Sequence, residues 1–171
     1  MTTFVSVGNA TQPFDRLLEA ILRLPSLPQP VIVQHGHTRF GAPGFDARPF
    51  LGMAEFGELL ASADLLILHA GAGSVIHALR AGKIPVVMPR RKEFGEHLDD
   101  HQVEFGRVLA DTGKVVLAEG PDQLVCAVEE ALRQQAAGRV QGSEPPLVKM
   151  IGDVLGRCES RHKDAEAGKS W

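Results

Sequence analysis

Residues and patterns that mark several classes of protein are scarce in this sequence. It contains no Tyr and one Trp, so few aromatic rings are present on which nucleic-acid bases could stack. Its two cysteines, Cys126 and Cys158, lie far apart and outside any Cys-x-x-Cys pair, which argues against a disulfide scaffold or a zinc finger. No apolar run approaches the roughly 20 residues that cross a bilayer, and the first residues lack the pattern of a secretion signal. The net charge of -3 gives no basic footprint for nucleic acid. We therefore expect a cytoplasmic protein that does not bind nucleic acid.

Short apolar runs alternate along the chain with segments of helical periodicity. The clearest run, Leu65–Leu68, is continuously apolar, which is typical of a strand covered on both faces. Further strands are predicted at 4–7, 31–33, 84–88 and 115–117, with a short one at Phe50–Leu51. Helices are predicted between Pro13 and Pro25, up to Ala63, up to a C-terminal glycine at Gly82, after Asp99 and after Pro121. This order predicts an α/β fold, a Rossmann-like doubly wound parallel sheet.

The C-terminal part of the chain differs in composition from the rest. We assign residues 1–135 to one α/β domain and the polar, glycine-containing stretch 136–145 to a linker. Residues 146–157 carry an apolar stripe at helical spacing, which predicts an amphipathic helix. This helix either docks on a partner or packs on its own sheet. Residues 158–171 have mixed charges and few apolar side chains, so we expect disorder there.

A glycine-rich turn, His69–Ser74, joins a predicted buried strand to a helix. Ligands of doubly wound sheets bind beyond the carboxyl ends of the strands. Gly71 and Gly73 would let the backbone turn sharply and approach a ligand, while Ser74 could cap the helix and donate its hydroxyl. The free amides of a helix N-terminus favour phosphate. Ile76 stands where a dinucleotide fingerprint has its third glycine. The turn is therefore either a phosphate site of another kind or a tight turn without a ligand.

Two groups of titratable residues allow more than one interpretation. His97 and His101 are four residues apart, a spacing that on a helix could bring two imidazoles to one metal. The Gly and Asp residues around them favour a loop, so we expect no metal site. The basic run Arg90–Lys92 follows a predicted strand. It either attracts a diphosphate or an anionic membrane surface, or it forms a solvated face.

The glycine turn and the sequence GEHLDDHQ at 95–102 together resemble the donor-binding, C-terminal domain of glycosyltransferase family 28. The resemblance covers most of the chain, from Phe4 to Leu132, and is strongest in DLLILHAGAGSVIHALRAGKIPVVMP at 64–89. It is closest to the PssE-type exopolysaccharide subunits and to the soluble subunit of the two-component N-acetylglucosaminyldiphosphodolichol transferase. It corresponds to half of a MurG-like GT-B enzyme.

The resemblance implies a UDP-sugar site at the positions that match the family motifs. The diphosphate would be held by the backbone of Gly71, Ala72 and Gly73 and by the Ser74 hydroxyl. The other implied contacts are Phe50 and the Leu51 backbone with uracil, Gly8 and Asn9 along the same crevice, and His101 and Gln102 with the sugar.

One position departs from the pattern of the lipid-II-forming members of the family. His77 stands where they have a ribose-binding carboxylate. A neutral imidazole has one acceptor nitrogen, whereas a carboxylate can accept from both ribose hydroxyls. Ribose is therefore held differently here, or His77 faces solvent.

The resemblance also implies an activity and its partners. The expected activity is that of an inverting hexosyltransferase, the catalytic, donor-binding subunit that moves sugar from a UDP-sugar to a lipid-linked acceptor in polysaccharide biosynthesis. We expect no cofactor beyond this donor substrate. The acceptor half would belong to a membrane-anchored partner in a heterodimer at the inner face of the cytoplasmic membrane. The catalytic base, which the sequence does not assign, would belong either to that partner or to this chain. The alternative is a non-catalytic nucleotide-binding or regulatory module.

Overall fold

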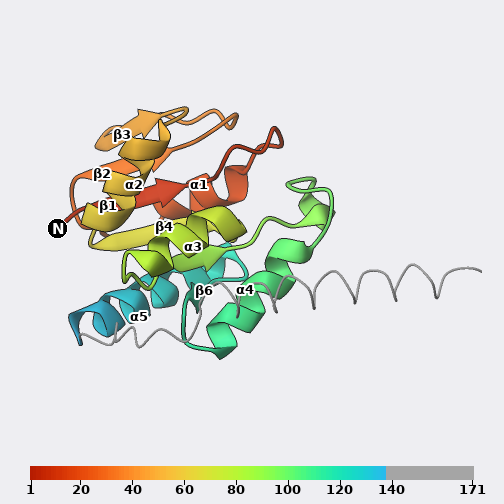
Figure 1. Ribbon diagram of the computed structural model, residues 1–171. Coiled ribbons are helices and arrows are strands. Elements are labelled where there is room, and N and C mark those ends of the chain that lie inside the picture. Colours follow the sequence, from red (N-terminus) through yellow and green to blue (C-terminus); the bar gives the residue numbers. More distant parts are fainter. Residues whose placement is uncertain (138–171) are drawn as a thin grey trace, which may run out of the picture. The chain divides into compact units, whose positions relative to one another are not determined.

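A six-stranded sheet forms the centre of the computed structural model, which describes residues 1–137 (Figure 1). The strand order is β3-β2-β1-β4-β5-β6, and every neighbouring pair is parallel. The predicted doubly wound parallel sheet is thereby confirmed. The strands are β1 (Thr3–Ser6), β2 (Val31–Gln34), β3 (Phe45–Arg48), β4 (Leu65–His69), β5 (Val86–Met88) and β6 (Val116–Leu117). The helices are α1 (Asp15–Leu22), α2 (Met53–Ser62), α3 (Ala72–Arg80), α4 (His101–Asp111) and α5 (Leu124–Ala136), with 3-10 turns η1 (Lys92–Phe94) and η2 (Pro121–Gln123).

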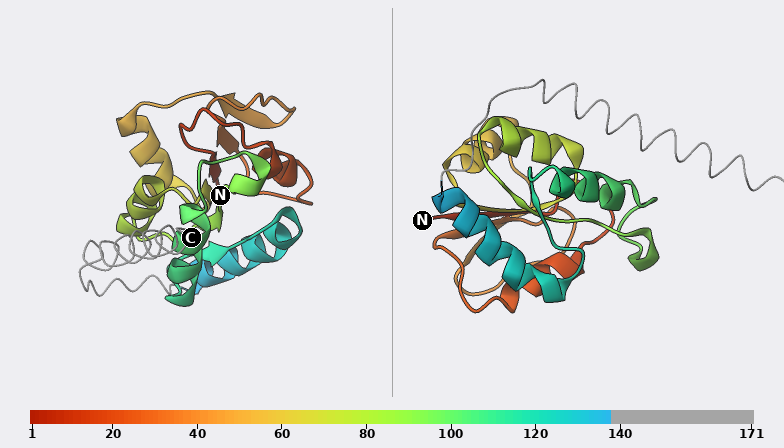
Figure 2. Two further views of the ribbon diagram at one scale, coloured as in Figure 1. Left: turned by 90° about the vertical axis from the view of Figure 1, so that its right-hand side faces the viewer. Right: turned by 90° about the horizontal axis from the view of Figure 1, so that it is seen from below.

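Helices cover both faces of the sheet, α1 and α5 on one side and α2, α3 and α4 on the other (Figure 2). Successive side chains of a strand point to opposite faces. In β4, Leu65 and Ile67 therefore pack with α1 and α5, while Leu66 and Leu68 pack with α2 and α3. Because both faces are buried, β4 is apolar at its first four positions, which explains its strong signal in the sequence.

The edge strand β3 lies outside the position predicted for it. The prediction of a strand at Phe50–Leu51 is wrong, because the chain pairs with β2 at Phe45–Arg48 instead. This strand has a neighbour on one side and is half-buried or exposed along its length. An edge strand of this kind needs no continuous apolar run and leaves a weak pattern in the sequence.

One predicted helix end is matched by the structure, and one helix runs past a predicted boundary. Gly82 follows the last turn of α3 with a φ of 71°, so the predicted C-terminal glycine is confirmed. Helix α5 continues to Ala136, one residue past the predicted domain end. The predicted helix at 146–157 and tail at 158–171 lie outside the described residues, as does the linker beyond Ala137. Among the helices within residues 1–137, none is both long enough and apolar enough to cross a membrane.

Candidate functional site

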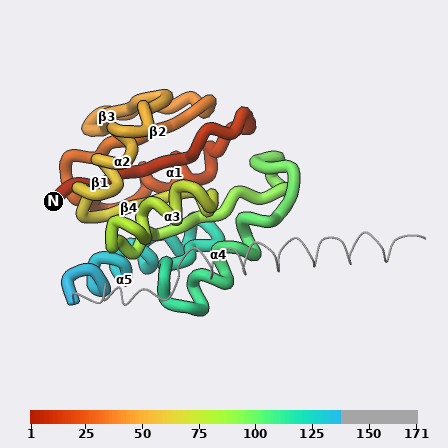
Figure 3. The backbone as a smooth tube through the Cα atoms, viewed as in Figure 1, coloured from red at the N-terminus to blue at the C-terminus, as the bar shows by residue number. Residues whose placement is uncertain are grey.

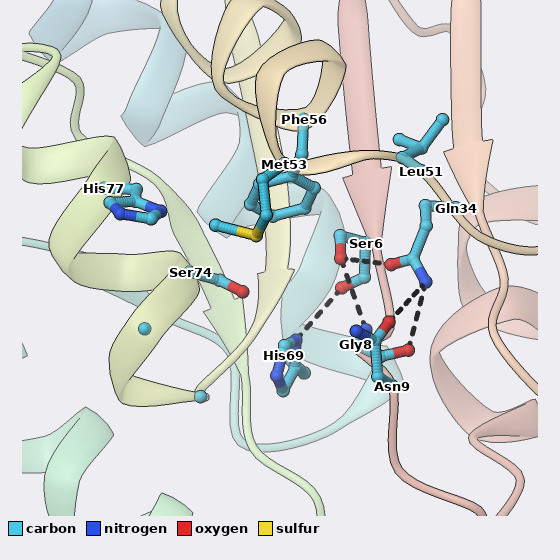
Figure 4. Close-up of a pocket in the computed structure, with 12 residues that line it drawn as sticks. Ser6, Gly8, Asn9, Gln34, Leu51, Met53, Phe56, His69, Ser74 and His77 are labelled. Carbon is cyan, nitrogen blue, oxygen red and sulfur yellow. Dashed lines mark hydrogen bonds between the residues drawn. The ribbon is translucent and has the colours of Figure 1, made fainter.

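A cavity of about 300 Å³ opens where the strand order of the sheet reverses (Figure 4). Strands β1 and β4 are neighbours there, but the chain continues from β1 toward one edge of the sheet and from β4 toward the other. Loops leaving two such strands diverge, which creates the crevice where this class of sheet binds ligands. The residues that line the cavity are Ser6, Gly8, Asn9, Gln34, Leu51, Met53, Phe56, His69, Gly71, Gly73, Ser74 and His77.

The buried amide of Gln34 organises one wall of the cavity. Its Nε2 donates to Gly8 O at 3.1 Å, to Asn9 Oδ1 at 3.2 Å and to Pro49 O at 3.2 Å. Its Oε1 accepts from Ser6 Oγ at 2.6 Å, and this hydroxyl in turn accepts from Gly8 N at 3.2 Å. With its oxygen engaged, the Asn9 amide has its NH₂ group left to donate toward a ligand.

The glycine turn opens α3 with a backbone N-cap. Gly71 is the N-cap residue, with an extended backbone and no side-chain cap, and Ser74 is the third residue of the helix. The prediction that Ser74 caps this helix is therefore wrong, because it lies one turn too far along. Its hydroxyl lines the cavity instead. The amides of residues 72–74 have no acceptor within the helix, since Val75 N is the first amide that donates along it, to Gly71 O at 3.1 Å. The start of α3 thus presents unpaired donors beside a hydroxyl.

The two glycines of the turn matter because they lack a side chain, not because they allow an unusual backbone conformation. Gly71 has a φ of −77°, which any residue can adopt. A Cβ at Gly71 would overlap Nε2 of His69, and a Cβ at Gly8 would lie 2.6 Å from the same ring. A Cβ at Gly73, in contrast, would meet no atom within 4 Å. The turn is therefore built around the His69 imidazole, and at Gly73 it leaves room on the cavity side.

His69 is a cavity residue that the sequence reasoning missed. It ends β4, and its Nδ1 donates to Ser6 O at 3.4 Å. Burial, helped by the charge of Arg90, lowers the pKa of His69 to about 4. The ring is therefore neutral at neutral pH. Its place as the last residue of a central parallel strand was the available signal, because strand ends of this kind border the crevice.

An apolar wall faces the polar one across the cavity. It consists of Leu51, Met53 and Phe56, which follow β3 and begin α2. Phe56 is held by an edge-on contact with Phe4, with ring centroids 5.5 Å apart. Of the two residues expected at uracil, the structure brings Leu51 to the cavity. Phe50 is half-exposed and lies edge-on to His37 instead, with centroids 5.1 Å apart.

The remaining predicted site residues do not line this cavity. Ala72 lies in the first turn of α3, and His101 and Gln102 begin α4. His97 and His101 each place Nδ1 on the carboxylate of Asp99, at 3.0 and 2.8 Å. Burial raises the pKa of Asp99, but the hydrogen bonds from His101 and the charges of His101 and His97 outweigh it, so the net pKa is lowered. Within residues 1–137 no group of three potential metal ligands comes together.

The basic run after β5 is divided between very different environments. Arg90 is completely buried, so both interpretations offered for it, attraction of a ligand or membrane and a solvated face, are wrong for this residue. Arg91 forms ion pairs with Glu93 and Glu119, at 3.1 and 3.2 Å. Lys92 is exposed.

Comparison with solved structures shows that this fold occurs in glycosyltransferases. The structure is similar to the glycotransferase of kitacinnamycin, with a TM-score of 0.61 and 22% identity over 92% of this chain and 42% of that one. It is similar also to Acinetobacter baumannii MurG, with a TM-score of 0.56 and 21% identity over 91% of this chain and 49% of that one. The fold is that of one half of a GT-B glycosyltransferase.

Sequence comparison then gives the family. Residues 2–144 match the model of the glycosyltransferase family 28 C-terminal domain, and the chain belongs to this family. It is 34% identical over 128 residues to the UDP-N-acetylglucosamine transferase subunit ALG13 of Yarrowia lipolytica, a match that covers 64% of this chain and 60% of that protein.

A bacterial relative matches a smaller part of its own length. The Syntrophus aciditrophicus UDP-N-acetylglucosamine–N-acetylmuramyl-(pentapeptide) pyrophosphoryl-undecaprenol N-acetylglucosamine transferase is 30% identical over 110 residues, which are 64% of this chain and 29% of that protein. The chain thus spans less than two thirds of the length of either relative.

Proposed function

We propose that this chain is the donor-binding part of an inverting glycosyltransferase that moves a sugar from a UDP-sugar to a lipid-linked acceptor. The observation that carries the proposal is the cavity at the point where the strand order reverses, which lies between the start of α3 and an apolar wall. The chain that forms it belongs to a glycosyltransferase family. Both relatives described above are named for UDP-N-acetylglucosamine, and the bacterial one for a pyrophosphoryl-undecaprenol acceptor. These names support the same donor and acceptor classes here.

The proposed chemistry uses the start of α3 as an anion site. When the bond between sugar and phosphate breaks, negative charge grows on the departing diphosphate. The free amides at residues 72–74 and the Ser74 hydroxyl are fixed donors that stabilise this charge where it develops. The uracil base of the donor would pack on the apolar wall of Leu51, Met53 and Phe56. A cavity of about 300 Å³ is at the lower end of the range for small-molecule sites, which suits one half of a cleft.

The acceptor side of the reaction is proposed to lie on another subunit, anchored in the membrane. One relative is itself named a subunit, and the chain corresponds to 60% of its length. Such a partner would hold the lipid-linked acceptor, supply or complete the catalytic base, and recruit this chain to the inner face of the cytoplasmic membrane. The transfer would need no cofactor besides the donor.

The proposal is tested by measuring UDP binding to the whole chain by calorimetry. Wild-type protein binds UDP, and Ser74→Ala weakens binding roughly 10- to 100-fold, because one hydrogen bond to a charged group is worth about 1.5–3 kcal/mol. Ser62→Ala is the matched control, since the Ser62 hydroxyl is exposed on α2 and donates to Glu58 O. A wild-type chain that binds no UDP, or equal affinity in wild type and Ser74→Ala, overturns the assignment.

A further inference from the structure

A buried arginine lies behind the cavity without lining it. Arg90 follows β5, and none of its surface is exposed. Burying a guanidinium costs free energy unless hydrogen bonds replace its water. The burial lowers the pKa of Arg90 to about 10, so the group stays charged at neutral pH. Such a residue needs partners, and the identity of the partners indicates what it does.

The guanidinium of Arg90 binds main-chain carbonyls rather than a carboxylate. Nε and Nη2 donate to Val7 O at 3.3 and 2.8 Å, and Nη1 donates to Gln12 O at 2.8 Å and to Glu96 O at 3.0 Å. The Phe14 ring covers it, with the guanidinium carbon 4.8 Å from the ring centroid. The loop from β1 to α1 is thus wrapped around this one side chain.

The carboxylate of the adjacent Glu96 is engaged elsewhere. Arg16 holds it with two hydrogen bonds of 3.0 and 2.7 Å, and Arg91 N donates to it at 2.9 Å. Arg16 and Glu96 form an almost buried ion pair beside Arg90. The Arg16–Glu96 pair joins α1 to the loop between β5 and α4, and Arg90 joins that loop to the loop between β1 and α1. The two loops lie at the same end of the sheet (Figure 3).

The first loop leads directly to the cavity, and the second contacts Gln102, which lies outside the cavity but which the family resemblance implies at the sugar. Val7, which accepts two of the hydrogen bonds, is followed by Gly8 and Asn9 of the cavity wall. On the other side, the backbone amide of Arg90 donates to Oε1 of Gln102 at 3.1 Å. The side-chain oxygen of Gln102 is thereby held, and its NH₂ group is left as the donor.

We propose that Arg90 is a positioning residue for nucleotide-sugar binding: its buried guanidinium sets the β1–α1 loop that carries Gly8 and Asn9, and its backbone amide orients Gln102. The inference rests on the proposed function for its ligand. The requirement is for the planar fork of arginine, because three carbonyls on two loops accept from one rigid group. Lysine keeps the charge but offers a single flexible ammonium and cannot span them in the same way.

The test compares Arg90→Lys with the matched control Arg91→Lys. Arg91 is the next residue, and its guanidinium binds Glu93 and Glu119 rather than the loop of Gly8. With each protein held well below its melting temperature, Arg90→Lys weakens UDP binding about tenfold or more, and Arg91→Lys changes it less than threefold. In NMR spectra recorded without ligand, the side-chain NH₂ signals of Asn9 and Gln102 shift in Arg90→Lys and do not shift in Arg91→Lys.

The readouts separate a positioning role from a structural one. A folded Arg90→Lys with a lower melting temperature but wild-type UDP affinity and unmoved amide signals overturns the inference. If Arg90→Lys does not fold, Phe14→Leu removes the ring over the guanidinium with little change in packed volume, and the same two readouts then decide in the same directions. Failure of the wild-type chain to bind UDP counts against the proposed function, whereas the amide signals still test Arg90.

Discussion

The imidazole of His69 fills the space that two residues without side chains leave open. Gly8 and Gly71 approach the ring from different loops, and either Cβ would collide with it. Contacts of this kind couple residues, because the cost of a change at one depends on the identity of the other. The residue that ends β4 therefore determines what is tolerated at two other positions of the cavity wall.

Gly71→Ala is expected to lower the free energy of unfolding by about 1–3 kcal/mol, because the added methyl group overlaps the ring of His69. In a His69→Ala background the same change is expected to cost far less, since the ring is gone. Urea unfolding of the wild type, both single variants and the double variant measures the coupling. A coupling close to zero would show that the collision does not govern this position.

The depressed pKa of His69 makes stability depend on pH. The pKa of His69 is 6.5 in the unfolded chain and about 4 in the folded protein, so the unfolded state binds more protons between these two pH values. The contribution of His69 is complete above pH 6.5 and is lost as the pH falls toward 4, by at most about 3 kcal/mol. Urea unfolding of wild type and His69→Asn from pH 4 to pH 7.5 checks this. The variant should lack this part of the slope, and equal slopes in the two proteins would contradict the assignment.

At the scale of elements, the first turn of α3 is the part whose geometry most directly meets a ligand. It combines an extended glycine N-cap, three amides without helical acceptors and one hydroxyl on the cavity. Helix α2 supplies a useful comparison, because it also contains a glycine, Gly57, at which an added Cβ would meet no atom within 4 Å.

Gly73→Ala is expected to leave the fold intact and to weaken UDP binding at least severalfold. The new methyl group meets no protein atom within 4 Å, and alanine favours a helix over glycine by up to about 1 kcal/mol. The group would instead occupy the space beside the diphosphate. Gly57→Ala is the control, which should gain stability without any change in UDP affinity. Thermal melting and calorimetry measure both effects, and undiminished binding by Gly73→Ala would place the diphosphate elsewhere.

The elements differ in how well the sequence predicts them, for physical reasons. β4 is buried on both faces and shows this in four consecutive apolar residues, whereas the edge strand β3, with the sequence FDAR, has no such signature. At the site, glycine spacing predicts the turn at Gly71 but not the ring of His69 that explains it. The burial of Arg90 is the feature that the sequence predicts least well. A run of basic residues indicates a solvent-exposed surface, whereas Arg90 is buried because carbonyl groups far away in the sequence accept its hydrogen bonds.

At the scale of the whole molecule, the cavity is assembled by topology. Its walls come from the ends of β1, β2 and β4 and the starts of α2 and α3, which only the strand order brings together. All of these segments belong to one sheet and the helices that cover it. If the proposed function holds, this sheet provides the donor side, and the opposing side of the cleft must be contributed by a second body.

The chain alone is therefore expected to bind UDP but not to glycosylate lipid. Radiolabelled transfer from UDP-sugar to a lipid-linked acceptor is measured with the chain alone, with a candidate membrane-anchored subunit alone, and with both. Activity in the mixture and in neither part supports a divided enzyme. Full activity of the chain by itself would refute the division, and UDP binding without transfer in any combination would favour a regulatory module.

The apolar wall has a further implication for how readily this scaffold can change its ligand. Leu51, Met53 and Phe56 lie on one short stretch that follows the edge strand β3, while Gln34 binds Gly8 and Asn9 of the polar wall. Phe56 is held by Phe4 of β1, so Leu51 and Met53 are the positions of this wall that can change while the first turn of α3 stays the same. Selectivity for the nucleobase would then change, by evolution or by engineering, independently of the amides and the hydroxyl that bind the phosphates.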